Sequence, residues 1–335
     1  MAKTLISDIV IPEVFDPYFI KRTAELSNLI ASGIVVPDPK LDTLAASGGT
    51  IITMPFFTDL DGADQILDDS NPLVVANIGT ATDMARLHLR GDARSVNDLA
   101  QALSGDDPLA AIVDLIAGYW TRKEQALLIK TLEGVFTDND DNDDGDLIYV
   151  HAAEASGDVK AWNDSSPTVM SPDAIVSGQA LLGDNMDKFT AIIMHSKCLT
   201  DLIKQELIDY ERPSGATTKI PYYLDKRIIV DDGCPKRDGS GSPASTVYQS
   251  YLFATGAIGR GEGGAPVPSE LERSALDSDT RLITRRHFLL HPRGFKWVEG
   301  SISGAAPTNL ECSDGTHFDR VYEQKQCRCV MIETN

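Results

Sequence analysis

The feature that most constrains this 335-residue chain is an unusually long helical pattern, from Asp106 to Phe136. Apolar side chains recur along it every three or four residues, which is the spacing of one face of an α-helix. Asp106 or Asp107 can cap its first turn, and Pro108 suits that turn because the N–H that proline lacks would have no partner there. At 1.5 Å per residue the helix would span about 45 Å, longer than most globular helices. We therefore expect a spine along which other elements lie.

Two long strands are expected before this helix. The first runs over Ile51–Phe57, and the return strand alternates apolar and polar side chains over Met84–Arg90 until Gly91-Asp92 ends it. A short helix is expected from Ser95 to Leu103. Because a two-stranded ribbon with little core of its own is marginal in isolation, the ribbon needs a surface to lie on, and a neighbouring subunit is the simplest candidate.

The remaining chain is predicted to form an N-terminal arm and a mixed α/β body. The arm contains an amphipathic helix over Pro12–Ile30 and an extended segment at Pro37-Asp38-Pro39. Lys236–Thr246 is rich in glycine and serine and is expected to be a mobile surface loop. Strands are expected at 147–153, 189–194, 226–230, 248–258, 281–290 and 327–332, and helices at 171–182 and 198–208.

Composition excludes several classes of protein. The hydrophobic fraction of 42% indicates a globular chain, and no apolar run is long enough to cross a bilayer. The formal net charge of −20 argues against a protein that grips nucleic acid through its phosphates. The first residues lack the apolar core of a secretion signal, and the odd number of cysteines, five, is typical of reduced cytoplasmic thiols.

The acidic stretch Asp138–Asp146 imitates the start of a calcium loop. Carboxylates alternate from Asp140 and a glycine occupies the sixth position. His151, however, stands at the twelfth position, where calcium loops place a bidentate glutamate, and a strand is expected to follow instead of a helix. We therefore expect a solvated turn without a metal ion.

A zinc site and a phosphate cradle are weighed in the same way. Zinc could be bound only by a set drawn from Cys327, Cys329, Cys312, His317 and His195, which lacks a second pair at the usual short spacing. The glycines from residue 256 to 264 follow a strand, but the Ala-Pro-Val-Pro sequence after them prevents the helix that a phosphate cradle needs, so a bend or loop is expected. No nucleophile, base and carboxylate set stands out, and we predict no catalytic, cofactor-binding or metal-binding residue.

Several stretches spread over the whole chain resemble one family, the major capsid proteins of tailed bacteriophages and prophages. The matching stretches are Ile11-Pro12-Glu13-Val14-Phe15, Gly48-Gly49-Thr50 with Met54-Pro55-Phe56-Phe57, Asp107-Pro108-Leu109 with Tyr119-Trp120, Leu132-Glu133-Gly134-Val135-Phe136, and His291-Pro292-Arg293-Gly294-Phe295-Lys296-Trp297. The order of arm, ribbon, long helix and α/β body is also similar to that family. The acidic loop and the Gly/Ser segment are not features of the resemblance.

The resemblance implies an α+β fold and a structural function. It divides the chain into an N-terminal arm (1–45), an extended loop or β-ribbon (46–92), a peripheral domain with the spine helix 106–136 (93–165), an axial domain (166–250), the long strands of the peripheral domain (251–297) and an axial tail (298–335). Such a subunit self-assembles through pentamers and hexamers into an icosahedral shell, the capsid of a virion. The shell encloses double-stranded DNA without binding it specifically. Assembly would take place in the cytoplasm of the bacterial host, with a separate scaffolding protein and a portal and without a membrane.

The resemblance leaves one structural question and one rival. Some capsids of this fold join subunits through a loop lysine and a neighbour's asparagine, but here no lysine lies between Lys40 and Lys123, so a non-covalent shell is expected. The rival is a metal-binding cytoplasmic enzyme that uses the Cys/His or Asp-rich cluster.

Overall fold

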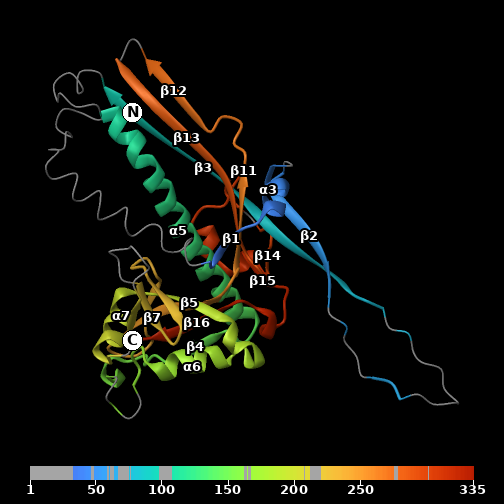
Figure 1. Cartoon of the computed structure of the whole chain (residues 1–335), viewed down its shortest axis with the longest axis vertical. Coiled ribbons are helices and arrows are strands. Elements are labelled where there is room, and N and C mark those ends of the chain that lie inside the picture. Colours follow the sequence, from blue (N-terminus) through green and yellow to red (C-terminus); the bar gives the residue numbers. More distant parts are fainter. Residues whose placement is uncertain are drawn as a thin grey trace.

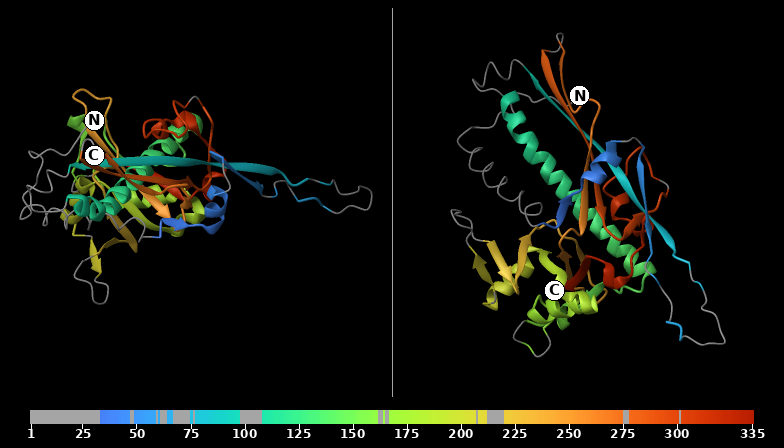
Figure 2. Two further views of the ribbon diagram at one scale, coloured as in Figure 1. Left: turned by 90° about the horizontal axis from the view of Figure 1, so that it is seen from above. Right: turned by 45° about the vertical axis from the view of Figure 1, so that its right-hand side comes forward.

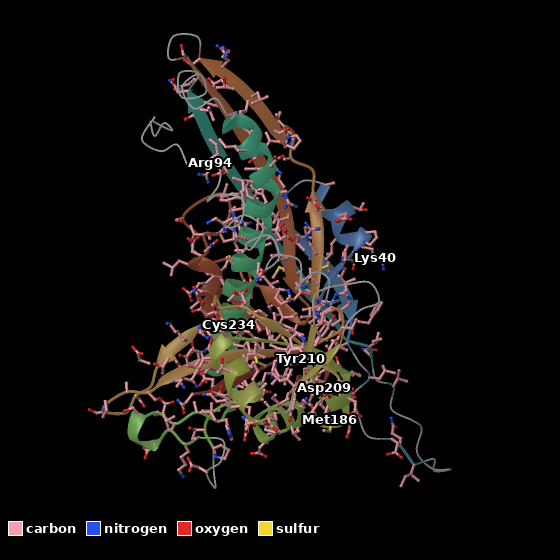
Figure 3. All side chains as sticks on the ribbon, turned by 60° about the vertical axis from the view of Figure 1, so that its left-hand side comes forward. Lys40, Arg94, Met186, Asp209, Tyr210 and Cys234 are labelled. Atoms are coloured by element: carbon pink, nitrogen blue, oxygen red, sulfur yellow. The ribbon has the colours of Figure 1, made fainter. Side chains whose placement is uncertain are left out.

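The computed structural model is organised along one long helix, α5 (Pro108–Asn142), with a mixed sheet-and-helix body at its C-terminal end and a ribbon that projects to one side (Figure 1). Figure 3 shows Arg94 near the far end of this spine, whereas Cys234, Tyr210 and Met186 lie in the body. The described residues are 33–46, 49–58, 60, 64–66, 75, 77–97, 108–161, 164, 167–206, 208–211, 220–274, 278–300 and 302–335. The expected arm helix Pro12–Ile30 lies outside them.

The expected spine helix is present and extends beyond its expected end at Phe136. Its 35 residues correspond to a length of about 52 Å at 1.5 Å per residue. The acidic stretch was expected to be a turn from Asp138 onward, but its first residues belong to the helix. The helix ends because Asp144 and Gly145 adopt positive φ angles of 57° and 64°. The Asn139 side chain then holds the turn, since its Oδ1 accepts a hydrogen bond from the Leu147 N–H at 3.1 Å.

A long sheet runs beside the spine. In the described chain its order is β1 (Val35–Pro37), β11 (Ile258–Gly263), β13 (Asp279–Pro292), β3 (Thr80–Asn97) and β2 (Ile51–Phe57), with β12 (Ser269–Ser274) also paired to β13. The return strand was expected to end at Gly91-Asp92, but β3 continues to Asn97. It does so because β13 pairs with it as far as Asp279 opposite Asn97, which supplies backbone partners through the glycine. The helix expected from Ser95 is therefore wrong over 95–97; the rest of it is not described.

The body is built on a second sheet. Its order in the described chain is β4 (Ile148–Val150), β16 (Cys329–Thr334), β10 (Thr246–Ala254), β5 (Phe189–Met194), β8 (Lys226–Val230), β7 (Ile220–Tyr223) and β6 (Asp209–Glu211), with β9 (Lys236–Asp238) also paired to β10. The helices α6 (Pro172–Ala180) and α7 (Ser196–Lys204) belong to the same body. In a separate pair of strands, β14 (Phe295–Trp297) contacts β3 and β15 (Phe318–Arg320) contacts the spine. The strands predicted at 189–194 and 226–230 are confirmed.

The strand expected over 248–258 is two strands in two sheets. β10 ends at Ala254, and Gly256 turns the chain with a φ of 69° before β11 begins at Ile258. The glycine-rich stretch expected to be a bend or loop is therefore largely the strand β11. Its glycines serve close packing: a Cβ on Gly261 would lie 2.9 Å from the Cβ of Leu41, on the short helix α3 (Pro39–Ala46) that the extended-segment prediction missed.

The Gly/Ser segment, expected to be a mobile loop, is fastened to the body. Its first residues form β9, and the Ser240 N–H donates to the Glu154 carboxylate at 2.7 Å. A Cβ on Gly241 would lie 2.4 Å from the Cα of Ala155, so the chain passes too close there for a larger residue. The glycines are thus explained by close backbone packing against residues 154–155.

The main hydrophobic core lies between the body sheet and the second half of α5. Phe136 stacks on Tyr251 of β10 with ring centroids 5.4 Å apart. Gly134 faces the segment after β14, where a Cβ would lie 2.4 Å from the Cys312 carbonyl oxygen, so the glycine permits close packing in mid-helix. The helix residues buried in this core are Leu127, Leu128, Leu132, Val135 and Phe136. Within the described residues, no helix combines the length and apolarity needed to span a membrane.

Candidate functional site

The most distinctive surface of the molecule is the ribbon of β2 and β3. The two strands pair in antiparallel fashion from Ile51 opposite Arg86 to Phe57 opposite Thr80. The ladder continues with a hydrogen bond from the Thr58 N–H to the Gly79 carbonyl at 3.0 Å. Seen from above, the ribbon leads straight away from the rest of the molecule (Figure 2). It therefore projects from the rest of the described structure (Figure 2).

Large apolar side chains are exposed at the outer end of this ribbon. Their exposed fractions are 70% for Phe57, 78% for Leu60, 92% for Ile66, 88% for Val75 and 53% for Ile78. A single exposed apolar side chain on a protein surface is ordinary, but a run of them in one projecting segment marks an interaction site. We name these five side chains the ribbon apolar set.

The root of the ribbon, where Ile51 and Ile52 pair with Arg86 and Ala85, has in contrast a core of its own. Ile52, Ala85 and Leu87 are buried against Leu41 of α3 and Leu289 of β13. The expectation that the whole segment 46–92 lacks a core is therefore wrong for its root. The reason is α3, which covers this face of the sheet and which the sequence pattern did not reveal.

The opposite face of the root is polar and buried. Arg86 donates from Nη2 to the Ala305 carbonyl at 3.0 Å, and Arg90 donates to the Pro307 carbonyl at 2.8 Å. Burial and the charges of Arg90 and Arg86 lower the pKa of His88 to about 3, so this imidazole is neutral. These contacts bind the segment after β14 across β3 and fix the direction in which the ribbon leaves the body.

An ionic cluster joins the spine to the long sheet. Glu124 of α5 contacts the Arg260 guanidinium of β11 and lies 3.6 Å from Arg286 Nη1 of β13. Glu262 completes the cluster with an Arg286 contact of 2.7 Å. Buried carboxylates are normally paired, and here one carboxylate links two strands to the helix. The sequence analysis missed this cluster because Glu124 lies 136 positions before Arg260 in the chain.

The acidic stretch does not have the geometry of a calcium loop. Arg320 lies in its midst, with Nη1 at 2.6 Å from Asp146 Oδ1 and Nη2 at 3.4 Å from Asp143 Oδ1. His151, at the expected ligand position, follows the strand β4 and donates its N–H to the Glu333 carbonyl. Burial raises the pKa of Asp138 to about 6. In the described part of the chain, no group of three or more His, Cys, Asp and Glu side chains has an arrangement that could hold a metal.

The cysteines and histidines considered for zinc occupy separate settings. The Cys327 thiol points toward the Glu323 carbonyl, 3.5 Å away, and burial raises its pKa to about 12. His317 stacks on Trp297 with centroids 5.1 Å apart, and His195 caps α7 by accepting the Lys197 N–H. All five cysteines are free and buried. Protonated, buried thiols of this kind are packing residues and poor zinc ligands.

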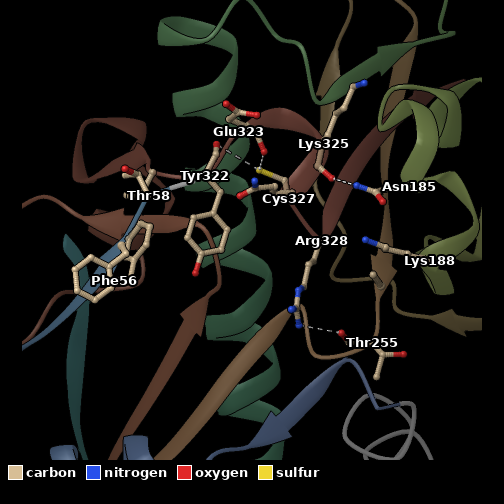
Figure 4. A pocket seen from close by; sticks show the side chains of 14 residues that line it. Phe56, Thr58, Asn185, Lys188, Thr255, Tyr322, Glu323, Lys325, Cys327 and Arg328 are labelled. Atoms are coloured by element: carbon tan, nitrogen blue, oxygen red, sulfur yellow. Dashed lines mark hydrogen bonds between the residues drawn. The ribbon is translucent and has the colours of Figure 1, made fainter. Parts of the chain in front are cut away.

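A groove of about 970 Å³ lies between the end of β2 and the body. One wall is the end of β2, where the Phe56 ring meets the Tyr322 ring edge-on with centroids 5.3 Å apart. The opposite wall carries Lys188 from the turn before β5 (Figure 4). The sequence analysis did not identify this groove, because four segments far apart in the chain form it.

The chain is similar over nearly its full length to a curated protein, the major capsid protein of Bacillus phage SPP1. The two are 41% identical over 338 aligned positions, which cover 99% of this chain and 98% of the relative. This chain belongs to the phage major capsid protein family. No family profile matches the chain.

Solved structures of phage capsids show the same fold as this capsid protein. The capsid of Ralstonia phage GP4 covers 90% of this chain and 87% of its own with a TM-score of 0.60 and 13% identity. The capsid of Myoviridae phage XM1 has a TM-score of 0.53 and 11% identity, with 92% of this chain and 91% of its own covered. The head structure of Helicobacter pylori bacteriophage KHP40 also gives a TM-score of 0.53 at 8% identity, covering 90% and 86%.

The predicted α+β capsid fold and the predicted family are thus confirmed. The capsid protein is a structural subunit of a virion shell and not an enzyme, and its subunits assemble into multimers. The rival hypothesis of a metal-binding enzyme finds no support in the separate settings of the Cys/His set and in the arginine-filled acidic stretch.

Proposed function

We propose that this subunit forms an icosahedral shell of pentamers and hexamers in which the ribbon and the N-terminal arm make the main contacts between subunits. The ribbon apolar set carries the proposal, since five apolar side chains more than half exposed in one projecting segment need a surface to cover them. Assembly takes place in the cytoplasm of the bacterial host, with a scaffolding protein and a portal as separate partners.

In this proposal the chain divides as the family resemblance implies, with one change. Residues 1–45 are the arm, 46–92 the extended loop, 93–165 the peripheral domain with the spine, 166–250 the axial domain, 251–297 the peripheral strands and 298–335 the axial tail. Because β10 pairs with both β5 and β16 of the body sheet, we move the boundary at residue 251 to the turn after Ala254.

The shell encloses double-stranded DNA without specific binding. A formal charge of −20 on each subunit repels packaged DNA and keeps it from adhering to the wall. We assign no catalytic, cofactor-binding or metal-binding residue. The shell is non-covalent, because the extended loop offers no lysine amine, so boiled and reduced particles run on a denaturing gel as one band near 36.3 kDa. A ladder of covalent oligomers would contradict this.

A ribbon deletion tests the proposal. Residues 59–78 are replaced by an Asn-Gly turn, which leaves both strands of the root and their core intact. We expect a soluble subunit with the circular dichroism of the parent protein, and no closed shells in negative-stain micrographs when it is co-expressed with the phage's scaffolding protein. The unaltered protein, prepared in the same way, sets the yield of shells. Closed shells from the deletion variant, or an unfolded variant, would contradict the proposal.

A further inference from the structure

The groove between the end of β2 and the body is basic, although the chain as a whole is strongly acidic. Lys188, Lys325 and Arg328 line it together with one carboxylate, Glu323 (Figure 4). The formal charge of the lining is therefore +2, from three cations and one anion, in a chain whose net charge is −20. This local reversal of sign makes the groove a candidate site for an acidic ligand.

The cations of the groove are only weakly engaged within the subunit. Lys325 Nζ lies 3.6 Å from Asp184, and these side chains are 60% and 94% exposed, so solvent screens the pair. Within the part of the chain that the structure describes, Arg328 Nη1 donates only to the carbonyls of Thr255 and Gly256, at 3.4 and 3.3 Å. Lys188 makes no ion pair within the described residues. The positive charge thus remains available to a ligand.

The extended loop carries a segment of matching chemistry. Residues 59–69 contain five aspartates, and no lysine or arginine occurs between Lys40 and Arg86. The same segment contributes Leu60 and Ile66 to the ribbon apolar set. Since Phe57 in the groove wall is itself 70% exposed, an occupant with carboxylates and apolar side chains would find both kinds of partner there.

The described apolar residues of this segment, Leu60 and Ile66, do not line the groove of their own subunit. Leu60 and Ile66 are 78% and 92% exposed, and the ribbon leads away from the body (Figure 2). We propose that the groove receives the acidic segment 59–69 from the extended loop of a second copy of the chain. This docking contact rests on the proposed shell function, and it identifies the groove as the surface that the acidic loop of a neighbouring subunit contacts. It also makes subunit contact sensitive to ionic strength, because exposed charge pairs are screened by salt.

Photocrosslinking within assembled shells tests the contact directly. A benzophenone amino acid replaces Lys325, and shells are assembled from a mixture of ¹⁴N- and ¹⁵N-labelled subunits, irradiated, digested and analysed by mass spectrometry. We expect mixed-isotope crosslinks between the peptide around position 325 and the peptide that contains 59–69. Crosslinks to another segment of a second copy, to another protein or to nucleic acid would overturn the proposal, as would the absence of crosslinks from intact shells.

Charge reversal adds a second test. The groove variant K188E/K325E and the loop variant D64K/D68K are each expected to lower the yield of shells at least about tenfold, the factor that 1.4 kcal/mol represents. Their combination in one chain restores the opposite charges and should recover most of that yield. K160E/K236E, which changes two exposed lysines outside the groove, is the control and should assemble normally.

The outcomes separate this contact from the shell function itself. Normal assembly of the groove and loop variants would overturn the docking proposal while leaving the shell function intact. Failure of the combined variant to recover assembly, with its circular dichroism unchanged, would overturn it as well. Failure of the unaltered protein to form any shell would instead count against the proposed function.

Discussion

The ribbon and the body sheet use the same backbone hydrogen bonds but differ in what covers their side chains. Every residue of β16 is buried, because the strand lies inside the sheet between β4 and β10. β2, at the edge of its sheet, has one buried residue, Ile52, after which exposed and partly buried residues alternate as far as Phe57, which is 70% exposed. Since hydrophobic burial provides most of the stability of a sheet, the body buries its own side chains within one subunit, whereas we expect the outer ribbon to be covered by a second subunit.

The largest expected loss of stability comes from truncating a phenylalanine in the body. Phe253 of β10 is fully buried, so Phe253→Ala should lower the free energy of unfolding by about 3–5 kcal/mol. Phe57→Ala is the matched control in the ribbon, where the side chain is exposed, and should change it by less than about 0.5 kcal/mol. Urea unfolding of the isolated subunits measures both. Equal effects would show that the two sheets do not differ in burial.

The second largest loss of stability is expected from breaking the ionic cluster between the spine and the long sheet. Glu124→Ala leaves Arg260 without its closest carboxylate at a site where the Glu124 side chain is only 9% exposed, so we expect a loss of about 2–4 kcal/mol. The control is Glu133→Ala on the same helix, whose ion pair with Lys130 is partly exposed and should contribute at most about 1 kcal/mol. A Glu124→Ala loss no larger than the control would mean that the cluster does not hold the spine to the sheet.

A pH dependence is expected at the end of the spine. Burial raises the pKa of Asp138 to about 6. In the folded chain this carboxyl therefore keeps its proton up to about pH 6, whereas in the unfolded chain it loses the proton near pH 3.8. The contribution of Asp138 to the free energy of unfolding therefore falls as the pH rises from about 4 to about 6 and is constant above pH 6. Asp138→Asn should remove this fall and raise stability at pH 7 by about 2 kcal/mol.

The measurement is a series of urea unfolding curves between pH 4 and 7. Asp141→Asn, an exposed carboxylate of the same helix, serves as the control and should keep the dependence of the parent protein. A parallel pH profile for Asp138→Asn and the parent protein would show that the Asp138 carboxyl is not the group responsible.

A substitution in the outer ribbon is expected to have the smallest effect on the free energy of unfolding. The same substitution should have the clearest effect on assembly. Ile66 is 92% exposed, so Ile66→Glu should leave the unfolding of the isolated subunit unchanged within about 0.5 kcal/mol. It should nevertheless abolish closed shells, because a charge would be buried where the side chain meets its neighbour. Ile66→Leu, which keeps the apolar character, should assemble. Normal shells from Ile66→Glu would remove this side chain from the contact between subunits.

Elements with a strong local pattern were predicted well from the sequence. The spine was found because its apolar residues recur over many turns, and the body strands 189–194 and 226–230 because each is a short apolar run. The root helix α3 was missed, because two prolines close together favour an extended segment; the Asp38 carboxylate instead accepts the Lys40 N–H and begins the helix at Pro39. The groove was missed because no single stretch of sequence contains it.

The sequence by itself determined the family, the long helix, the acidic charge and the lysine-free extended loop, all of which depend on residue identity or local periodicity. Only the tertiary structure decided where strands continue and which charges meet. β3 passes through Gly91 because β13 pairs with it, and Gly134 and Gly241 stand where another segment passes too close for a side chain. Glu124 and Arg260 meet although 136 residues separate them. Such contacts between distant segments leave no periodic signal, because their energy comes from a partner that only the folded chain brings near.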